Sequence, residues 1–326
     1  MNSYLSGKRI LVTGGTGFIG SALIRGLLAG GAKVRSLDNN SRGSRSKLGE
    51  AASQIELFEG DIRDIGAVTK AVSGVDCVCH LAAVNGTEYF YSKPELVLEV
   101  AVKGMMNVLD ACISQGVRQL LTASSSEVYQ LPPRIPTAED APLVVPDPLN
   151  PRYSYGGGKI ISELLTLNYG RRVLERAMVF RPHNVYGPDM GREHVIPQIT
   201  LRMLRAQAQA GGSREFDFPI QGDGSETRSF LFIDDMVRGI LTLLERGEHL
   251  NVYHIGNSGE TAIRDLVQAI AQELDLAPRI VPGALQPGSV KRRCPDVSKI
   301  RKLGYEPKVT LQEGLKRTIP WYRENP

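Results

Sequence analysis

A glycine-rich turn between an apolar strand and an amphipathic helix is the feature that most constrains the fold of this chain. An apolar run at 9–13 leads into Gly14-Gly15-Thr16-Gly17-Phe18-Ile19-Gly20, and a helical pattern continues to about Ala29. A second strand pattern at 34–38 ends in Asp38. A lone glycine triplet is a weak signal, but strand, tight turn, helix, strand and acidic residue in this order are typical of a dinucleotide-binding unit.

The glycines of this turn have separate roles in such a unit. Gly14 allows the tight turn, Gly17 lets the backbone approach a pyrophosphate, and Gly20 lets helix and strand pack closely. The helix then starts at Phe18 and Ile19, so that its N-terminal N–H groups face the phosphates. We therefore expect these five residues to bind the cofactor.

Asp38 indicates which dinucleotide is bound. A carboxylate at the end of the second strand is placed to bind the adenosine ribose hydroxyls, and it would repel the 2′-phosphate of NADP. The sequence therefore favours NAD. Arg42 and Arg45 keep NADP as the minority alternative.

Further strand patterns at 55–58, 75–81, 117–123 and 176–180 alternate with helical segments. This alternation predicts an α/β fold, a Rossmann-type doubly wound parallel sheet. Two segments that follow strands are expected to add cofactor contacts. Asp61-Ile62 would lie beside adenine, although Asp61 could equally cap a helix, and the small residues of Leu81-Ala82-Ala83 would leave room for the cofactor.

Tyr155 and Lys159 lie one helical turn apart, on the same helix face. A free tyrosine titrates near about pH 10, too high for a general base at neutral pH. A nearby ammonium group favours the phenolate and would lower the Tyr155 pKa. Ser124-Ser125-Ser126-Glu127 follows a strand at the carboxyl end of the sheet, where such sheets bind ligands. A serine there could hold the oxygen that Tyr155 deprotonates while a nicotinamide takes the hydride.

Composition limits the partners. With 42% hydrophobic and 23% charged residues, the 326-residue chain has the profile of an ordinary globular protein. A net charge of +4 is too small to suggest nucleic acid and suits a small anionic ligand. We find no signal peptide and no apolar window of membrane-spanning length, so we expect a cytoplasmic protein. The four cysteines suggest reduced core thiols, and we expect no metal site.

After about residue 180 the pattern becomes less regular. We expect an NAD-binding domain formed by residues 1–180 with about 231–255. A smaller, discontinuous substrate-binding domain would be formed by residues 181–230 and 256–326. A Pro-rich loop at 131–151 crosses the surface between the two chemical motifs.

Taken together, the motifs resemble the extended short-chain dehydrogenase/reductases that modify nucleotide-activated sugars: epimerases, 4,6-dehydratases and UDP-glucuronate decarboxylases. The resemblance spans nearly the whole chain. It rests on GGTGFIG at 14–20, Asp38, Asp61-Ile62, LAA at 81–83, SSSEVY at 124–129, YGGGK at 155–159, RPHNVYGP at 181–188, GDGSETRSF at 222–230 and the segment 291–315. Gln130 stands where the family's Val-Tyr-Gly has glycine.

The resemblance implies an enzyme with a redox-neutral cycle. Tightly held NAD takes a hydride from C4 of a nucleotide-diphosphate sugar while Tyr155 takes the hydroxyl proton, and the hydride returns after the 4-keto intermediate has reacted. Lys159 would bind the nicotinamide ribose. Ser125 aligns with the residue that hydrogen-bonds the reacting oxygen, and Ser124 is the second choice.

The middle step depends on Glu127. Epimerisation at C4 is the reaction expected from its frequency in the family alone. Epimerases carry a small or hydroxyl residue at this position. Decarboxylases and GDP-mannose dehydratases carry a glutamate, and decarboxylases also have an arginine where Arg293 stands, which could grip a C6 carboxylate. Ser126 replaces the aspartate of the dTDP-glucose type of dehydratase. The alternative for Glu127 is a chemically idle charge that is hydrogen-bonded to backbone at a strand end.

The resemblance also suggests binding partners. Ser125, Ser126, Asn184, Arg228 and Arg293 are the candidate substrate-binding residues. A homodimer is expected through a four-helix interface made by the helices near 95–115 and 155–170. Leu96, Val100, Leu164 and Leu167 are the apolar residues left over on their second face. The alternative from another class is a non-catalytic, dinucleotide-binding regulator, which the joint presence of Ser125, Tyr155 and Lys159 disfavours.

Overall fold

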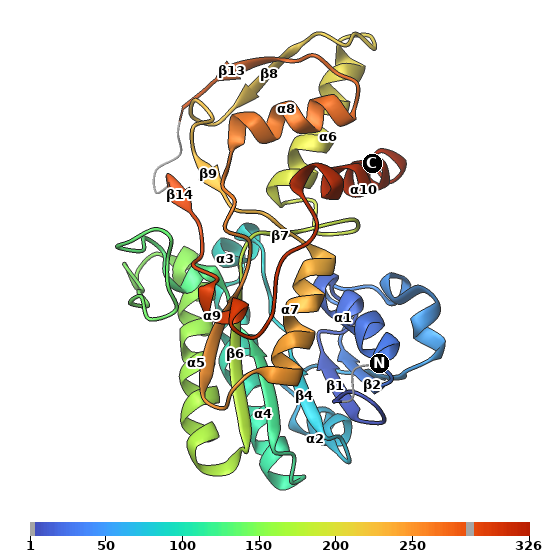
Figure 1. The fold of residues 1–326 in the computed structure, drawn as a ribbon, viewed down its shortest axis with the longest axis vertical. Coiled ribbons are helices and arrows are strands. Elements are labelled where there is room, and N and C mark those ends of the chain that lie inside the picture. The colour runs from blue at the N-terminus through green and yellow to red at the C-terminus, as the bar shows by residue number, and fades with distance from the viewer. Residues whose placement is uncertain (1–3, 285–289) are drawn as a thin grey trace.

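The computed structural model describes residues 4–284 and 290–326, and a seven-stranded sheet forms its centre (Figure 1). Its strands are all parallel and follow the order β11-β6-β5-β4-β1-β2-β3. They are β1 (Arg9–Thr13), β2 (Lys33–Asp38), β3 (Glu56–Glu59), β4 (Cys77–His80), β5 (Gln119–Ala123), β6 (Arg176–Pro182) and β11 (Asn251–Ile255).

Helices cover both faces of this sheet because successive strand residues point to opposite sides. Val12 belongs to the core shared with α1 (Phe18–Ala29) and α7 (Ile233–Arg246), whereas Leu11 packs in the second core. That second core lies under α2 (Ile65–Val72), α4 (Pro94–Ser114) and α5 (Ser154–Val173). The strand order reverses at β1 and β4, which makes their carboxyl ends the expected ligand-binding edge.

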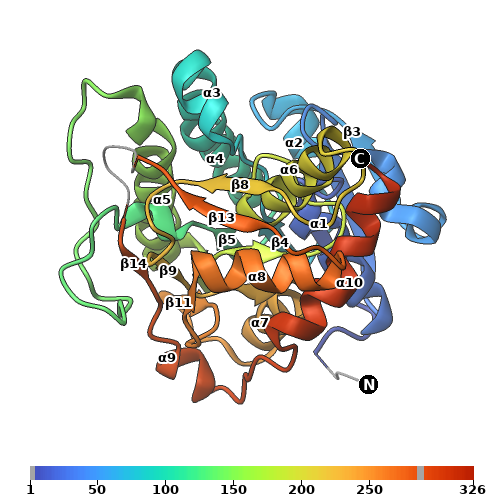
Figure 2. The same cartoon turned by 90° about the horizontal axis from the view of Figure 1, so that it is seen from above.

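The later part of the chain builds a smaller layer above this edge (Figures 1 and 2). Three helices and two paired strands form most of it: α6 (Val195–Gln209), α8 (Ile263–Glu273), α10 (Leu311–Glu324), β8 (Asp217–Ile220) and β13 (Arg279–Pro282). Short elements connect it to the sheet: β7 (Val185–Tyr186), β9 (Thr227–Arg228), β10 (Leu231–Phe232), β12 (Thr261–Ala262), β14 (Arg292–Arg293) and α9 (Ser298–Arg301). Four further short helices are η1 (Arg45–Ser53), α3 (Thr87–Ser92), η2 (Ser126–Val128) and η3 (Pro151–Tyr153).

The predicted doubly wound sheet is confirmed, and its strands lie within a few residues of the expected positions. Two local expectations are wrong. The cap of α2 is Asp64, whose side chain accepts hydrogen bonds from the Gly66 and Ala67 N–H groups, so Asp61 is free for another role. Val100 lies on the inner side of α4, buried in the second core, and is not part of an outer apolar face.

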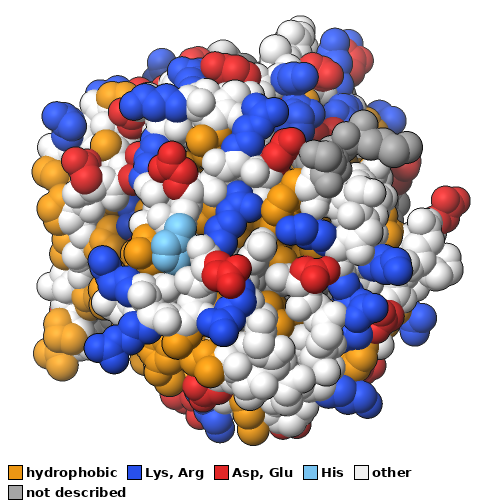
Figure 3. All heavy atoms as spheres, turned by 60° about the horizontal axis from the view of Figure 1, so that its bottom comes forward, with side chains coloured by type: hydrophobic (Ala, Val, Ile, Leu, Met, Phe, Trp, Pro, Cys, Tyr) orange, Lys and Arg blue, Asp and Glu red, His pale blue; other side chains and the backbone are white. Residues whose placement is uncertain are grey.

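The outer surface carries both signs of charge. Basic and acidic side chains are interspersed over the face shown in Figure 3, with hydrophobic side chains between them. Within residues 4–284 and 290–326, each helix is too short or too polar to cross a membrane.

Candidate active site

A cavity of about 670 Å³ runs across the carboxyl ends of the central strands. It gathers side chains that lie far apart in the sequence. Its lining includes nearly every residue that the sequence nominates for the cofactor and the reaction: Gly14, Gly17, Phe18, Ile19, Gly20, Asp38, Asp61, Ile62, Leu81, Ala82, Ala83, Ser125, Ser126, Glu127, Tyr155, Lys159, Asn184 and Arg293. Arg228 is the exception among the nominated residues.

The glycine turn is built for close backbone approach. Gly14 has φ +72°, in the left-handed region that favours glycine. A Cβ atom on Gly20 would lie 2.0 Å from the Gly14 carbonyl oxygen, so only glycine fits at the start of α1. The Gly17 N–H donates to the same oxygen at 3.1 Å. The turn therefore presents its backbone directly to the cavity.

Acidic residues line the cavity at the end reached from β2 and β3. The Asp38 carboxylate accepts hydrogen bonds from the Thr16 and Asn40 N–H groups, both at 2.9 Å, which fixes its orientation at the cavity wall. Asp61 pairs with Arg63 at 2.8 Å, and the hydrogen bond from Arg63 lowers the Asp61 pKa to about 2. Asp61 is therefore an ionised hydrogen-bond acceptor at neutral pH, and the Asp38 carboxylate is held in place by backbone donors.

Tyr155 is almost fully buried at the centre of the cavity. Its ring stacks on Phe90 with 5.1 Å between centroids, and Ser125 lies near enough to its hydroxyl to lower the pKa of the phenol. The second candidate, Ser124, donates instead to Glu163 at 2.5 Å, which engages it in the core. The geometry therefore favours Ser125 as the serine that acts with Tyr155.

Lys159 lies on the same face of α5, as the sequence predicts. Its ammonium nitrogen is 5.8 Å from the centroid of the Tyr155 ring and donates to the Ala123 carbonyl oxygen at 2.7 Å. Burial lowers the Lys159 pKa to about 8. The lysine is thus close to the phenol but hydrogen-bonded to the end of β5.

The expected lowering of the Tyr155 pKa is not found in the protein alone. Burial raises the pKa of this phenol to about 12, and the Ser125 hydrogen bond opposes the shift only in part. The physical reason is that the buried ring has lost water, while the lysine charge is directed at a backbone carbonyl.

Glu127 faces Arg293 across the cavity. The Arg293 guanidinium donates to one Glu127 carboxylate oxygen, and Arg152 lies 3.9 Å from the other. The Glu127 side chain is 25% exposed and that of Arg293 only 16%. Although burial opposes the shift, the charge and hydrogen bond of Arg293 hold the Glu127 pKa below its usual range. Glu127 is therefore an ionised cavity residue, and its side chain is paired with Arg293 and not with the backbone.

The turn that carries Glu127 fits closely against α5. Gln130 adopts φ +52°, the conformation for which the family pattern has glycine, and its side-chain amide donates to the Glu127 carbonyl oxygen at 2.5 Å. A Cβ atom on Gly156 would lie 3.0 Å from that same oxygen. The glycine after Tyr155 thus lets the helix of the Tyr155–Lys159 pair approach the Glu127 turn.

Two cavity residues were missed by the sequence analysis. Arg152 stands three positions before Tyr155, and its basic charge next to the motif was the available signal. Phe90 belongs to α3, and its stacking on Tyr155 could not be read from the sequence. Arg228, which was predicted, is not among the residues that line this cavity, but it pairs with Arg293 in the β9–β14 ladder.

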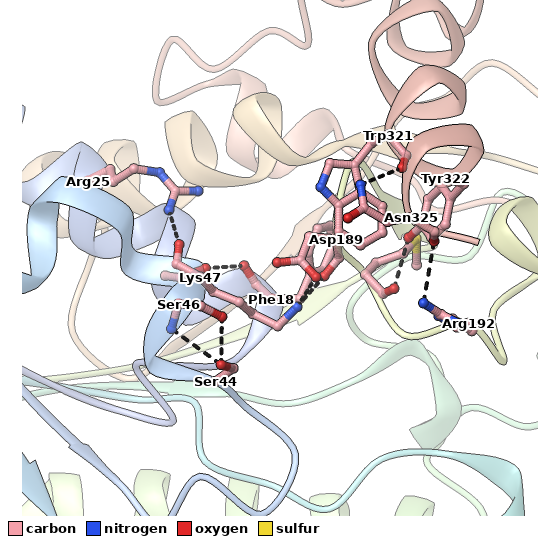
Figure 4. Close-up of polar contacts among 12 residues, drawn as sticks. Phe18, Arg25, Ser44, Ser46, Lys47, Asp189, Arg192, Trp321, Tyr322 and Asn325 are labelled. Carbon is pink, nitrogen blue, oxygen red and sulfur yellow. Dashed lines mark hydrogen bonds and ion pairs between the residues drawn. The ribbon is translucent and has the colours of Figure 1, made fainter.

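At the mouth of the cavity, segments from the two halves of the chain meet (Figure 4). Lys47 donates to both the carbonyl oxygen, at 2.7 Å, and the carboxylate of Asp189. Arg42 forms a second ion pair with Glu193. Tyr322 of α10 donates to the Met190 carbonyl oxygen at 2.8 Å. The two ion pairs join the segment after β2 to the segment after β7, and the Tyr322 hydrogen bond joins α10 to the segment after β7.

Comparison with known proteins identifies a family. Residues 10–256 match the model of the NAD dependent epimerase/dehydratase family. Among curated proteins, the chain is 32% identical to UDP-glucuronic acid decarboxylase 2 of Arabidopsis thaliana, covering 98% of this chain and 69% of that protein. It is 31% identical to UDP-N-acetyl-alpha-D-glucosaminuronate decarboxylase of Bacillus cytotoxicus, covering 97% and 98%.

Solved structures with a similar fold belong to related enzymes. A dTDP-glucose 4,6-dehydratase from Streptomyces venezuelae, determined with NAD bound, superposes with a TM-score of 0.83 at 33% identity, covering 97% of each chain. A UDP-glucose 4-epimerase from Thermotoga maritima superposes with a TM-score of 0.84 at 28% identity, covering 97% of this chain and 99% of the other. The neighbours thus include decarboxylases, a dehydratase and an epimerase.

Proposed function

The chain belongs to the NAD-dependent epimerase/dehydratase family, and from this premise we propose that it decarboxylates a nucleotide-activated hexuronate, with UDP-glucuronate as the first candidate. The observation that carries the proposal is the Glu127–Arg293 ion pair in the cavity wall, with Arg152 beside it. A neutral hexose offers these arginines no charge to bind, whereas a C6 carboxylate does.

The cavity fits NAD. The close approach of Gly20 to Gly14 leaves a backbone cradle that any side chain would fill, and Asp38 lies at the end of β2 to accept ribose hydroxyls. When bound, NAD accepts the hydride from sugar C4 and later returns it. Arg42, which kept NADP open, is engaged by Glu193.

In the first step Tyr155 takes the proton of the C4 hydroxyl while Ser125 holds the same oxygen. The influence of Ser125 on the Tyr155 pKa and the position of both residues in the cavity lining support this pairing. Lys159 supplies positive charge beside the phenolate that forms. The oxidised sugar is a β-keto acid, because its C4 carbonyl is two carbons from the C6 carboxylate.

In the second step the C5–C6 bond breaks and its electron pair moves into the enolate at C4. Tyr155, which carries the proton taken earlier, stabilises the enolate oxygen. Arg293 and Arg152 orient the carboxylate until carbon dioxide leaves. A proton from solvent then reaches C5 through Glu127, so that charge and atoms balance before the C4 carbonyl is reduced again.

The other reactions of the family use the pocket less completely. The 4,6-dehydratase of the dTDP-glucose type pairs an aspartate with the glutamate, and Ser126 stands in that place here. C4 epimerisation is the reaction expected from its frequency in the family alone, but it gives Glu127 and Arg293 no role in the chemistry. A non-catalytic regulator has no use for the Ser125–Tyr155–Lys159 group.

We further assign cofactor binding to residues 1–180 and 231–255, and sugar-nucleotide binding to residues 181–230 and 256–326. The first set supplies all seven strands of the sheet apart from the end of β6. Asn184, at the cavity, and Arg228, next to Arg293, are the candidates for holding the substrate diphosphate from the second set.

We also propose that the protein forms a homodimer through α4 and α5. Leu98 is 38% exposed, Ile161 is 38% exposed and Leu164 is 55% exposed on these two neighbouring helices. Such a row of apolar side chains suits a four-helix interface with a second copy. Sedimentation that gives a monomeric mass would contradict this. A cytoplasmic location is supported by the four buried free thiols.

The experiment incubates the enzyme and NAD with UDP-glucuronate, UDP-glucose, GDP-mannose and dTDP-glucose, and follows each product by mass spectrometry and proton NMR. Loss of carbon dioxide from UDP-glucuronate, abolished in Arg293→Ala, supports the proposal. Loss of water from a hexose would indicate a dehydratase. An unchanged mass with an inverted C4 proton signal, from any of these substrates, would indicate an epimerase and refute the proposal.

A further inference from the structure

A chain of buried hydrogen bonds runs behind the cavity wall. Arg181 of β6 donates to the Tyr129 hydroxyl, which lies 2.5 Å from Nε2 of His254 in β11. Nδ1 of His254 lies 3.0 Å from the Asp296 carbonyl oxygen. The three side chains are at most 3% exposed. Buried polar groups in such a chain are costly to leave unpaired, so its members hold one another in place.

The donors and acceptors of this chain follow from chemistry. A carbonyl oxygen can only accept, so Nδ1 of His254 carries the proton and donates to Asp296. Nε2 is then an acceptor and takes the hydrogen bond of the Tyr129 hydroxyl, whose oxygen accepts from Arg181. The arrangement requires a neutral His254, and burial does lower the pKa of this histidine to about 4.

The far end of the chain is anchored to the helix of the catalytic pair. Arg181 makes two hydrogen bonds to Glu163 of α5, from Nε at 2.8 Å and from Nη2 at 2.6 Å. Both side chains are only 3% exposed. Charge-assisted paired bonds of this kind are rigid, so Arg181 forms a fixed support for Tyr129.

His254 contacts the two chain segments that carry the members of the Glu127–Arg293 ion pair. Tyr129 follows Glu127 by two residues and Asp296 follows Arg293 by three. The Arg293 segment is also attached by Thr137, which donates to the Cys294 carbonyl oxygen at 2.9 Å and accepts from the Asp296 N–H at 2.7 Å, and by the Ser229 N–H, which donates to the Arg293 carbonyl oxygen at 3.2 Å. The paired strand that contains Arg293, β14, is two residues long. His254 therefore bridges the segment of the acid and the segment of the arginine.

We propose that His254 is a positioning residue that sets the Arg293 guanidinium against Glu127 by fixing the backbone of Asp296 relative to Tyr129. The proposal rests on the function proposed above only in that Arg293 takes part in turnover. His183 supports the same place, because its ring packs edge-on against His254 with 4.6 Å between centroids.

The test is a double-mutant cycle with His254→Phe and Arg293→Ala. Phenylalanine keeps the ring packing and removes both hydrogen bonds, so we expect kcat to fall about tenfold to a hundredfold with little change in bound NAD. In the Arg293→Ala background the same change should alter kcat by less than about twofold, because a residue that acts through Arg293 has nothing left to position. His254→Gln, which can donate and accept, should recover part of the loss.

An equal fall in both backgrounds would overturn the proposal, as would unchanged kcat in His254→Phe. If His254→Phe does not retain NAD, Tyr129→Phe replaces it in the same cycle, because this change removes the hydroxyl that is hydrogen-bonded to Nε2 of His254. His249→Phe is the control, because His249 is an exposed histidine that accepts from the Ala177 N–H away from the cavity. The double-mutant cycle is measured with whichever nucleotide sugar the enzyme converts. If the hexuronate assignment is wrong, the product analysis shows it, and the cycle still tests the role of His254.

Discussion

The two ion pairs at the cavity mouth should slow the release of NAD. Lys47 and Arg42 come from the segment after the Asp38 strand, and their partners Asp189 and Glu193 come from the sugar side of the cavity. All four line the cavity that also contains the glycine turn. Because the pairs join the two sides of this cavity, we expect them to oppose the release of a cofactor seated on that turn. The perturbation is the double variant Asp189→Asn, Glu193→Gln.

The expected change in the rate of NAD release follows from the exposure of the paired side chains. The Lys47 side chain is 17% exposed and that of Arg42 is 32% exposed, with partners at 38% and 41%. Pairs this accessible contribute about 0.2–1 kcal/mol each. The hydrogen bond from Lys47 to the Asp189 carbonyl oxygen survives the substitution. Losing both carboxylates should therefore lower the barrier to release by about 0.4–2 kcal/mol and speed release roughly 2- to 30-fold.

The assay dilutes NAD-loaded enzyme into an NAD-consuming trap and follows protein-bound NAD with time. Release from the wild type should quicken as salt screens the pairs, and release from the double variant should depend less on salt. Asparagine tolerates the φ of +61° at position 189, so the backbone is preserved. Asp275→Asn is the matched control, because Asp275 has φ +57° and pairs with Arg214 on the exposed surface. Equal release rates for wild type and double variant would refute the reasoning.

The remaining predictions concern the catalytic pair, the glycine turn and acid stability. Tyr155→Phe should keep NAD and lose about 10²- to 10⁴-fold in kcat, so normal turnover would remove Tyr155 from the acid–base role. Gly20→Ala should purify without NAD, because its Cβ would lie 2.0 Å from the Gly14 carbonyl oxygen; full NAD content would contradict this close approach. Burial lowers the pKa of His80 to about 3 and of His254 to about 4, and that of His183 well below its ordinary value. The unfolded chain therefore takes up protons first, and each of these histidines should cost up to about 1.4 kcal/mol of unfolding free energy per pH unit as pH falls from about 6.5 towards 4. Urea unfolding across this range measures the slope, which His254→Gln should reduce by about one proton; an unchanged slope would contradict the neutral buried state.

The sequence predicted the cofactor half of the molecule well because its signals are local. The turn from Gly14 to Gly20 has only one workable arrangement between a parallel strand and a helix, and Asp38 follows from the length of the next strand. The Tyr155–Lys159 spacing is likewise a property of a single helix. Such features need no knowledge of distant contacts, and the structure has them where the pattern put them.

The sugar side depends on contacts that no local pattern contains. Glu127 and Arg293 are 166 positions apart, and their ion pair arises only when β14 is brought to the turn after β5. Phe90 reaches Tyr155 from a short helix with no motif of its own. The error over the Tyr155 pKa has the same origin, because burial and the direction of the Lys159 amine are properties of the packed site.

The charges around Glu127 bear on which sugar the cavity accepts. Arg293, Arg152 and Arg228 all contribute positive charge at Glu127, so one carboxylate faces three guanidinium groups. The pair with Arg293 uses one of its five N–H donors in the structure, and the others remain for a second planar anion. A substrate diphosphate near Arg228 would neutralise part of this excess. On the proposed function, a hexuronate carboxylate would complete the balance, whereas a neutral C6 hydroxymethyl group would leave partly buried guanidinium groups uncompensated.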